Sequence, residues 1–406
     1  MGGVDREKSF DFGHGGQFNR ERKKWDGEIC SGGFQPPWTS VAGSPRYGPV
    51  ASEAKSLDNP LFEKQPYLAG LNKVTTEKKY DVFGVGNAIV DILAQVDDSI
   101  ITDLGLNKGG MALMSTEQQG DVLTKIDDPS LTFASGGSAA NTMVAIKQSG
   151  GTGVYAGKVT DDSNGQFYKK DMEAAGIPFY VPMATDSKET TGSCVVLTTP
   201  DAERTMCTHL GISTTLQKSE IDFDLLAQSK CCYVEGYLWD ADDPRAASIA
   251  TFEECKKLGI PASFSFSDPF LVDRYGDQFK DIVNDYCDIV FCNADEAKMF
   301  MGVQDMDACA EKLGAVCDLV FITDGGNGCH VIEKGKPQLV PGFDVKAVDT
   351  VGAGDSFAGG VLYGITNGLS NEKAAKWGNY FAAQVVSKFG PRLDASQESK
   401  KAEILG

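Results

Sequence analysis

The stretch that decides the fold is DTVGAGDSFAGG, residues 349–360, in which Gly-Ala-Gly separates two aspartates at the start of an apolar run. A glycine inside a regular element costs about 1 kcal/mol relative to alanine, so this spacing indicates a close approach of the backbone. KAVDTVGAGD is typical of a strand that ends in a turn, and SFAGGVLYGITNGL predicts a helix. Gly352, Ala353 and Gly354 therefore begin a helix, where free N–H groups and the helix dipole favour an anion.

Asp355 lies inside this predicted anion site. A carboxylate beside a bound phosphate can accept the proton of an attacking hydroxyl, so Asp355 is a candidate general base for phosphoryl transfer. The alternative is that Asp355 only caps the helix. Phe357 and Val361 stand one turn apart and predict the buried face of this helix.

Apolar runs alternate with helix-length segments from residue 80 onward. The runs include YDVFGVG, VYAGKVT, CCYVEGYL, PASFSFSD, CDIVFCN and LVFITDGG. This alternation predicts an α/β fold with a mostly parallel central sheet and helices on both faces, whose ligands bind at the carboxyl ends of the strands. Two stretches lack the helices between them and predict a small β lid, over about residues 104–116 and 178–210.

The composition limits the partners of the protein. The 406 residues carry a net charge of −19, which argues against nucleic-acid binding, and no apolar run is long enough to cross a membrane. The 11 cysteines show no C-x-x-C spacing and scatter through apolar runs, so we expect buried, reduced thiols and a cytoplasmic protein.

Residues 1–79 form a different segment, rich in glycine, proline and serine and without regular periodicity. A flexible tail is one interpretation. The segment also contains many aromatic residues, which disordered chains usually lack, so the other hypothesis is an arm that docks on a protein partner. The main domain then covers residues 80–406.

The D-T-x-G-A-G-D-x-F-x-x-G run resembles the C-terminal signature of the ribokinase-like, or PfkB-type, sugar and nucleoside kinases. The resemblance covers about residues 80–392 and implies a ribokinase-like fold. FASGGSAANT is similar to the family's N-terminal glycine motif, and GNAIVDI to its first-strand motif. The resemblance implies that these two motifs bind substrate hydroxyls through Asn87, Asp91, Gly136, Gly137 and Asn141.

Further motifs imply ATP, Mg²⁺ and a monovalent cation such as K⁺. CNADEA supplies the family's N-x-x-E motif, which organises Mg²⁺ and phosphates largely through water. TDGGNG resembles its nucleotide-contacting turn. The residues implied are Asn293 and Glu296 for Mg²⁺; Thr323, Gly325, Gly328 and Asn379 for the nucleotide; and Asp349 and Val351 for the monovalent cation. Taken alone, Asn293 could be a helix cap, Glu296 a solvated helix residue and the glycine turn an ordinary hairpin.

Within the family, the sequence looks most like the adenosine-kinase-like branch. The stretches that carry this likeness are GNAIVDI, GGSAANT, ERTM and GYLWD. The resemblance assigns Arg204 to phosphate, because a guanidinium matches two phosphate oxygens; a surface salt bridge is the alternative. Leu238 stands where relatives stack a phenylalanine on the purine, and Tyr237 or Trp239 could replace it. We therefore expect phosphorylation of the adenosine 5′-hydroxyl, with another nucleoside, a free sugar (ribose or a ketohexose), or a non-catalytic subunit held by its tail as alternatives.

Overall fold

The computed structural model describes residues 78–406 except 127–130, 181–182 and 186. The predicted arm over residues 1–79 lies outside the described residues apart from Lys78 and Lys79, so its docking stays a prediction. No helix in the described residues is long and apolar enough to cross a membrane. The ten cysteines that the structure describes are all buried, as predicted.

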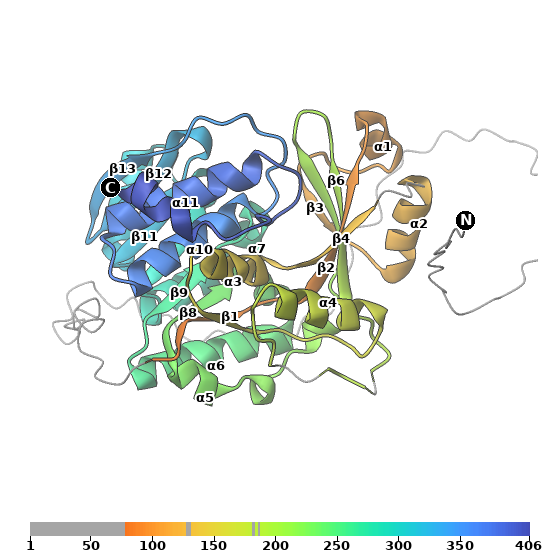
Figure 1. The fold of residues 1–406 in the computed structure, drawn as a ribbon, viewed down its shortest axis with the longest axis horizontal. Helices are drawn as coiled ribbons and strands as arrows, with labels where there is room; N and C mark the ends of the chain where they lie inside the picture. The colour runs from red at the N-terminus through yellow and green to blue at the C-terminus, as the bar shows by residue number, and fades with distance from the viewer. Residues whose placement is uncertain (1–77, 127–130, 181–182, 186) are drawn as a thin grey trace, which may run out of the picture. The chain divides into compact units, whose positions relative to one another are not determined.

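The main sheet has eight strands in the order β13-β12-β11-β10-β9-β8-β1-β5 (Figure 1). Neighbouring strands from β5 through β11 are parallel, and β12 and β13 extend that edge as an antiparallel pair. The predicted mostly parallel sheet is therefore confirmed. Its strands are β1 (Tyr80–Val85), β5 (Gly153–Ala156), β8 (Ser229–Glu235), β9 (Ala262–Ser265), β10 (Ile289–Asn293), β11 (Leu319–Thr323), β12 (Gly328–Glu333) and β13 (Lys336–Pro341).

Helices cover both faces of this sheet because its strands are apolar on both sides. In β1, for example, Phe83 packs on one side and Val82 on the other. On the Phe83 side lie α5 (Phe223–Ala227), α6 (Asp242–Leu258), α7 (Pro269–Asp285), α8 (Ala294–Met301) and α9 (Met306–Val316). On the Val82 side lie α3 (Ser138–Gln148), α4 (Ser163–Ala174), α10 (Ala353–Thr366) and α11 (Asn371–Val386). The short α12 (Lys401–Leu405) packs against α11 through Ile404 and Leu405.

A second sheet of five strands has the order β3-β7-β6-β2-β4. It contains β2 (Ile89–Gln95), β3 (Met111–Leu113), β4 (Thr132–Gly136), β6 (Gly192–Thr198) and β7 (Arg204–His209). The helices α1 (Asp98–Asp103) and α2 (Thr116–Ile126) cover one face through a small apolar cluster around Ile101 and Val122.

The small sheet differs from the lid predicted from the sequence in two ways: it contains two more strands, and its second segment begins later along the chain. β2 and β4 also belong to this sheet, because the chain leaves the main sheet after β1 and pairs with β6 instead. The residues described between 178 and 191 are not lid strands; Phe179 and Ala184 form isolated bridges near β5 and α4.

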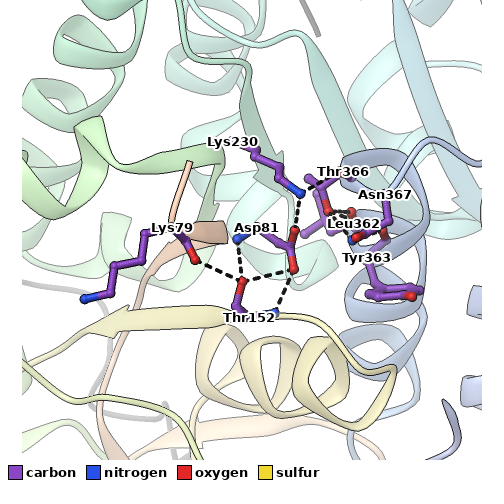
Figure 2. A network of polar contacts seen from close by, with 8 residues as sticks. All are labelled: Lys79, Asp81, Thr152, Lys230, Leu362, Tyr363, Thr366 and Asn367. Carbon is purple, nitrogen blue, oxygen red and sulfur yellow. Dashed lines mark hydrogen bonds and ion pairs between the residues drawn. The ribbon is translucent and has the colours of Figure 1, made fainter. Parts of the chain in front are cut away.

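The helix α10 begins at the predicted anion site and is held at its far end by a polar network (Figure 2). Lys230 Nζ donates to the Thr366 carbonyl at 3.1 Å and to Asp81 Oδ1 at 2.7 Å. The Thr152 amide and hydroxyl donate to Asp81 Oδ2 at 2.7 and 3.1 Å. This network fixes the C-terminal end of α10 on the main sheet, at the strand ends opposite the glycine turn. Phe357 and Val361 are buried, as predicted.

Candidate active site

A cavity of about 270 Å³ lies at the carboxyl ends of β1, β8, β9, β10 and β11, closed on another side by the small sheet. This is the edge where a parallel sheet is expected to bind its ligands. Most of the predicted site residues line the cavity: Asn87, Asp91, Gly137, Asn141, Arg204, Tyr237, Asn293, Glu296, Thr323, Val351, Gly352, Ala353, Gly354 and Asp355.

The N-terminus of α10 forms one wall of the cavity. Gly352 is its N-cap, with φ +73°, and no side chain caps the helix. A Cβ at Gly352 would lie 2.4 Å from the Pro391 carbonyl oxygen, so only glycine fits here. The N–H groups of Gly354 and Asp355 have no acceptor among the described residues. These free donors and the helix dipole favour an anion at this place.

Asp355 does not cap its own helix, so that alternative is wrong. Its carboxylate instead turns toward α3, where Ser138 Oγ donates to Oδ1 at 2.7 Å and Asn141 Nδ2 donates to Oδ2 at 3.0 Å. Burial raises the pKa of Asp355, and these two donors lower it in part. A carboxyl with a raised pKa is a better proton acceptor once it is ionised.

Asp91 faces the same cavity without any hydrogen-bond partner among the described residues. Burial raises its pKa to about 7, and the neighbouring Asp355 charge adds to the shift while Arg392 and Arg204 oppose it. Gly136 does not line the cavity, but it permits this geometry, because a Cβ there would lie 2.2 Å from the Asp91 carboxyl. A buried carboxylate without donors indicates a ligand that supplies them.

Glu235 joins Asn87 at the base of the cavity, and sequence analysis missed it. It ends β8, is 1% exposed, and accepts the Asn87 amide at 2.8 Å and the Ala139 amide at 2.7 Å. Burial raises its pKa to about 7. The Asn87 side chain acts only weakly on this carboxylate, and its Nδ2 is buried without a partner of hydrogen-bond geometry in the described chain. Asn87 Nδ2 is thus a donor available to a ligand.

Arg204 is the only basic side chain among the described residues that line the cavity. It forms no ion pair with any described carboxylate, which argues against the surface salt bridge. Its Nη1 donates to the Thr350 carbonyl at 3.3 Å, beside the N-terminus of α10. An unpaired guanidinium at that position suits a phosphate group.

Asn293 and Glu296 form a capping box at the start of α8, so the helix-cap interpretation of Asn293 is confirmed. Glu296 is not solvated, because it is 4% exposed, and burial raises its pKa to about 8. Both of its oxygens accept hydrogen bonds from Asn293, at 2.9 and 2.8 Å. The described residues contain no group of three or more side chains able to ligate a metal directly. The pair therefore fits Mg²⁺ only through water, as this ion prefers.

Several predicted residues lie outside the cavity lining, and the structure shows another contact for each. Leu238 differs from expectation: it is 1% exposed and packs in the core, whereas Tyr237 lies on the wall with its hydroxyl donating to the Ser267 carbonyl at 3.2 Å. Gly325 and Gly328 belong to the hairpin between β11 and β12, as the alternative stated. Asn379 donates to the Val340 and Pro341 carbonyls at 3.0 and 3.1 Å.

Asp349 is fully buried next to the cavity and organises the turn before α10. Its two oxygens accept the Val351 and Gly390 amides, each at 2.9 Å. Asp349 thus ties the turn before α10 to the segment after α11, and its role at a monovalent cation stays a prediction.

Comparison with known proteins agrees with this geometry. The family model described as pfkB family carbohydrate kinase matches residues 112–398. The chain belongs to this family of carbohydrate and nucleoside kinases, and it is a phosphotransferase with an alcohol group as acceptor.

The most similar proteins include kinases of both substrate classes. The structure of adenosine kinase from Sinorhizobium meliloti is 35% identical, with a TM-score of 0.77, over 80% of this chain and 99% of that one. A probable sugar kinase from Rhizobium etli is 32% identical, also with a TM-score of 0.77, over 80% and 98% of the two chains. The adenosine kinase of Dictyostelium discoideum is 27% identical over 77% of this chain and 96% of its own length.

Proposed function

We propose that the protein transfers the γ-phosphoryl group of ATP to the 5′-hydroxyl of adenosine or of a closely related nucleoside. The observation that carries this proposal is the pair of cavity carboxylates, Asp91 and Asp355. Asp91 has no protein donor, whereas Asp355 lies at the free N-terminus of α10. The first suits a pair of ribose hydroxyls, and the second suits the hydroxyl that attacks phosphorus.

Each residue has a defined role in this reaction. Asp91 accepts two substrate hydroxyls, while the free Nδ2 of Asn87 donates to an oxygen of the sugar. Asp355 accepts the proton of the attacking hydroxyl as the new P–O bond forms, and Ser138 and Asn141 hold its two oxygens in place. Gly136 and Gly137 allow close packing beneath the substrate side of the cavity, because a Cβ at Gly136 would lie 2.2 Å from the Asp91 carboxyl and one at Gly137 would lie 2.0 Å from the Asn87 carbonyl oxygen.

The phosphate side of the cavity is positively polarised by the chain itself. The free amides of Gly354 and Asp355 at the start of α10, together with the Arg204 guanidinium, stabilise negative charge on the transferring group. Asn293 and Glu296 would hold Mg²⁺ through water, and this ion supplies charge neutralisation for the phosphates. Thr323 on the cavity wall and the turn at Gly325 and Gly328 would contact the nucleotide.

A nucleoside is favoured over a free sugar by the apolar part of the lining. Met111, Met206, Leu210 and Tyr237 face the cavity and suit the flat surface of a base. The adenosine kinases among the relatives support this choice. The second candidate is a sugar kinase, which the Rhizobium etli relative and the additional cavity carboxylate Glu235 favour.

The test is phosphorylation by MgATP of adenosine, other nucleosides, ribose and fructose, each followed as phosphorylated product. We expect the highest kcat/KM with adenosine. Turnover of ribose or fructose without turnover of any nucleoside would establish the sugar kinase instead, and no turnover of any acceptor would favour the non-catalytic subunit.

The role of Asp355 is tested with Asp355→Asn, for which we expect kcat to fall by roughly 10²–10⁴. The matched control is Asp162→Asn, which changes a carboxylate to an amide at the N-cap of α4, outside the cavity lining. Because asparagine is also a good N-cap, this control should retain the wild-type kcat. An Asp355→Asn variant with near-normal kcat would remove the general base from the proposal.

A further inference from the structure

Arg392 lies behind the cavity, in the segment that follows α11. Its side chain is 12% exposed, and it does not line the cavity. Its guanidinium bridges three elements, because Nε donates to Asn141 Oδ1 of α3 at 2.8 Å and Nη1 donates to Ser135 Oγ of β4 at 2.7 Å. The same Nη1 lies 3.3 Å from Asp171 Oδ2 of α4.

These contacts determine the orientation of the Asn141 amide. An arginine side chain donates hydrogen bonds and cannot accept them, so the amide oxygen of Asn141 must face the guanidinium. The amide nitrogen then faces Asp355, and Nδ2 donates to Oδ2 at 3.0 Å. The reversed amide would place its NH₂ group against the guanidinium and its oxygen against the Asp355 carboxylate. Arg392 therefore determines which donor Asp355 receives.

The acidic network around Ser135 keeps the guanidinium in place. The Ser135 amide donates to Asp171 Oδ2 at 3.0 Å, and the Ser135 hydroxyl donates to the same oxygen. Arg392 thus lies between the partly exposed Asp171 carboxylate of α4 and the side-chain amide of Asn141, which donates to the proposed base. A residue that acts through another in this way does not need to touch the substrate.

The charge of Arg392 also acts on the cavity carboxylates. It lowers the pKa of both Asp91 and Asp355, against the burial that raises them. The other charged or titratable groups that act on these two carboxylates, or are acted on by them, come from α4, β6, β7, β8, the turn after β8 and the loop before α10: Tyr168, Cys194, Arg204, Tyr233, Glu235, Tyr237 and Asp349. Arg204 is the only group in this set that carries a positive charge, as Arg392 does.

We propose that Arg392 is a positioning residue for phosphoryl transfer, which locks the Asn141 amide so that Asp355 is aimed at the acceptor hydroxyl. The proposal rests on the proposed function, because it assigns Asp355 as the base. It predicts that loss of the guanidinium changes kcat and the titration of the site, while nucleotide binding stays intact.

The test compares Arg392→Met, Arg392→Lys and a matched control, Lys158→Met. Lys158 is also 12% exposed and forms an ion pair with Glu220, at 2.8 Å, away from the cavity. We expect Arg392→Met to lower kcat about 10- to 100-fold with little change in the KM for ATP, since a misplaced base costs rate and not affinity. The acid limb of its pH–rate profile should move to higher pH.

The other two variants separate positioning from charge and from packing. Arg392→Lys keeps the charge but cannot bridge Asn141 and Ser135 at once, so it should restore the acid limb without restoring kcat. Lys158→Met should lower thermal stability but leave kcat and the acid limb as in the wild type. Equal kcat and equal pH profiles for Arg392→Met and wild type would overturn the proposal.

A measurement without substrate keeps this test independent of the proposed function. If wild-type protein phosphorylates none of the acceptors, the proposed function fails, but the free protein can still be titrated by denaturation across pH. Arg392→Met should then lose stability more steeply than wild type as the pH rises from 5 to 8, because the cavity carboxylates ionise with less compensation. Parallel stability curves for the two proteins would refute the electrostatic part of the proposal.

Discussion

Replacement of Asp91 by asparagine should stabilise the ligand-free protein in neutral and alkaline solution. The carboxylate is buried, has no hydrogen-bond partner among the described residues, and has a pKa raised from 3.8 to about 7. Asparagine has nearly the same shape, so the close approach of Gly136 is preserved, but the buried negative charge is removed. The gain in stability should be accompanied by loss of substrate binding, as expected for a site built for a ligand.

The magnitude follows from the shift in pKa. One pKa unit corresponds to about 1.4 kcal/mol, so a shift of about 3 units makes the ionised Asp91 unfavourable for folding by about 4 kcal/mol above pH 7. In the unfolded chain the group loses its proton near pH 3.8, and in the folded protein near pH 7. The folded state therefore binds more protons between these values, and stability falls as the pH rises through that range. Between pH 5 and pH 8 this loss amounts to about 3 kcal/mol.

The assay is urea denaturation of both proteins at pH 5 and pH 8 without ligand. Asparagine introduces an NH₂ group with its own desolvation cost, but this contribution is the same at both pH values and cancels in the comparison. The advantage of Asp91→Asn over wild type should be larger at pH 8 than at pH 5 by about 3 kcal/mol. A difference that is independent of pH, or that shrinks as the pH rises, would refute the reasoning.

Two further predictions concern the ends of α10. Gly352→Ala should lower stability by at least about 2 kcal/mol and abolish phosphoryl transfer, because φ is +73° and the new Cβ would meet the Pro391 carbonyl at 2.4 Å. The matched control for stability is Gly354→Ala, because a Cβ at Gly354 would meet nothing within 4 Å. This control should leave the melting temperature unchanged or raise it. Equal melting temperatures for the two variants would contradict this account. At the other end, Lys230→Met leaves the buried Asp81 with only the Thr152 donors, so we expect a loss of about 1–3 kcal/mol in chemical denaturation, reduced because the lysine is one-third exposed. The kcat/KM of the Lys230→Met variant should stay near the wild-type value, since the network lies at the far end of the sheet from the cavity. An unchanged free energy of unfolding would show that the Lys230–Asp81 ion pair contributes nothing to stability.

The sequence by itself determined the features that depend on neighbouring residues. The glycine turn before α10, the helix that follows it and the parallel main sheet were all predictable. Gly352 needs a left-handed backbone, and the buried face of α10 repeats with the helical period. The resemblance of the motifs around Asp91, Asn141 and Asp355 to those of the kinase family also implied that these side chains share one site, and all three line the same cavity.

Only the tertiary structure decided which distant groups meet, because no local pattern specifies the partner of a strand or of a side chain. β2 pairs with β6 in the small sheet and not with the main sheet that the chain has just left. Glu235 and Arg392 carry no motif of their own. Arg392 lies 251 positions after Asn141 along the chain, and its effect on the proposed base exists only because packing brings the two together.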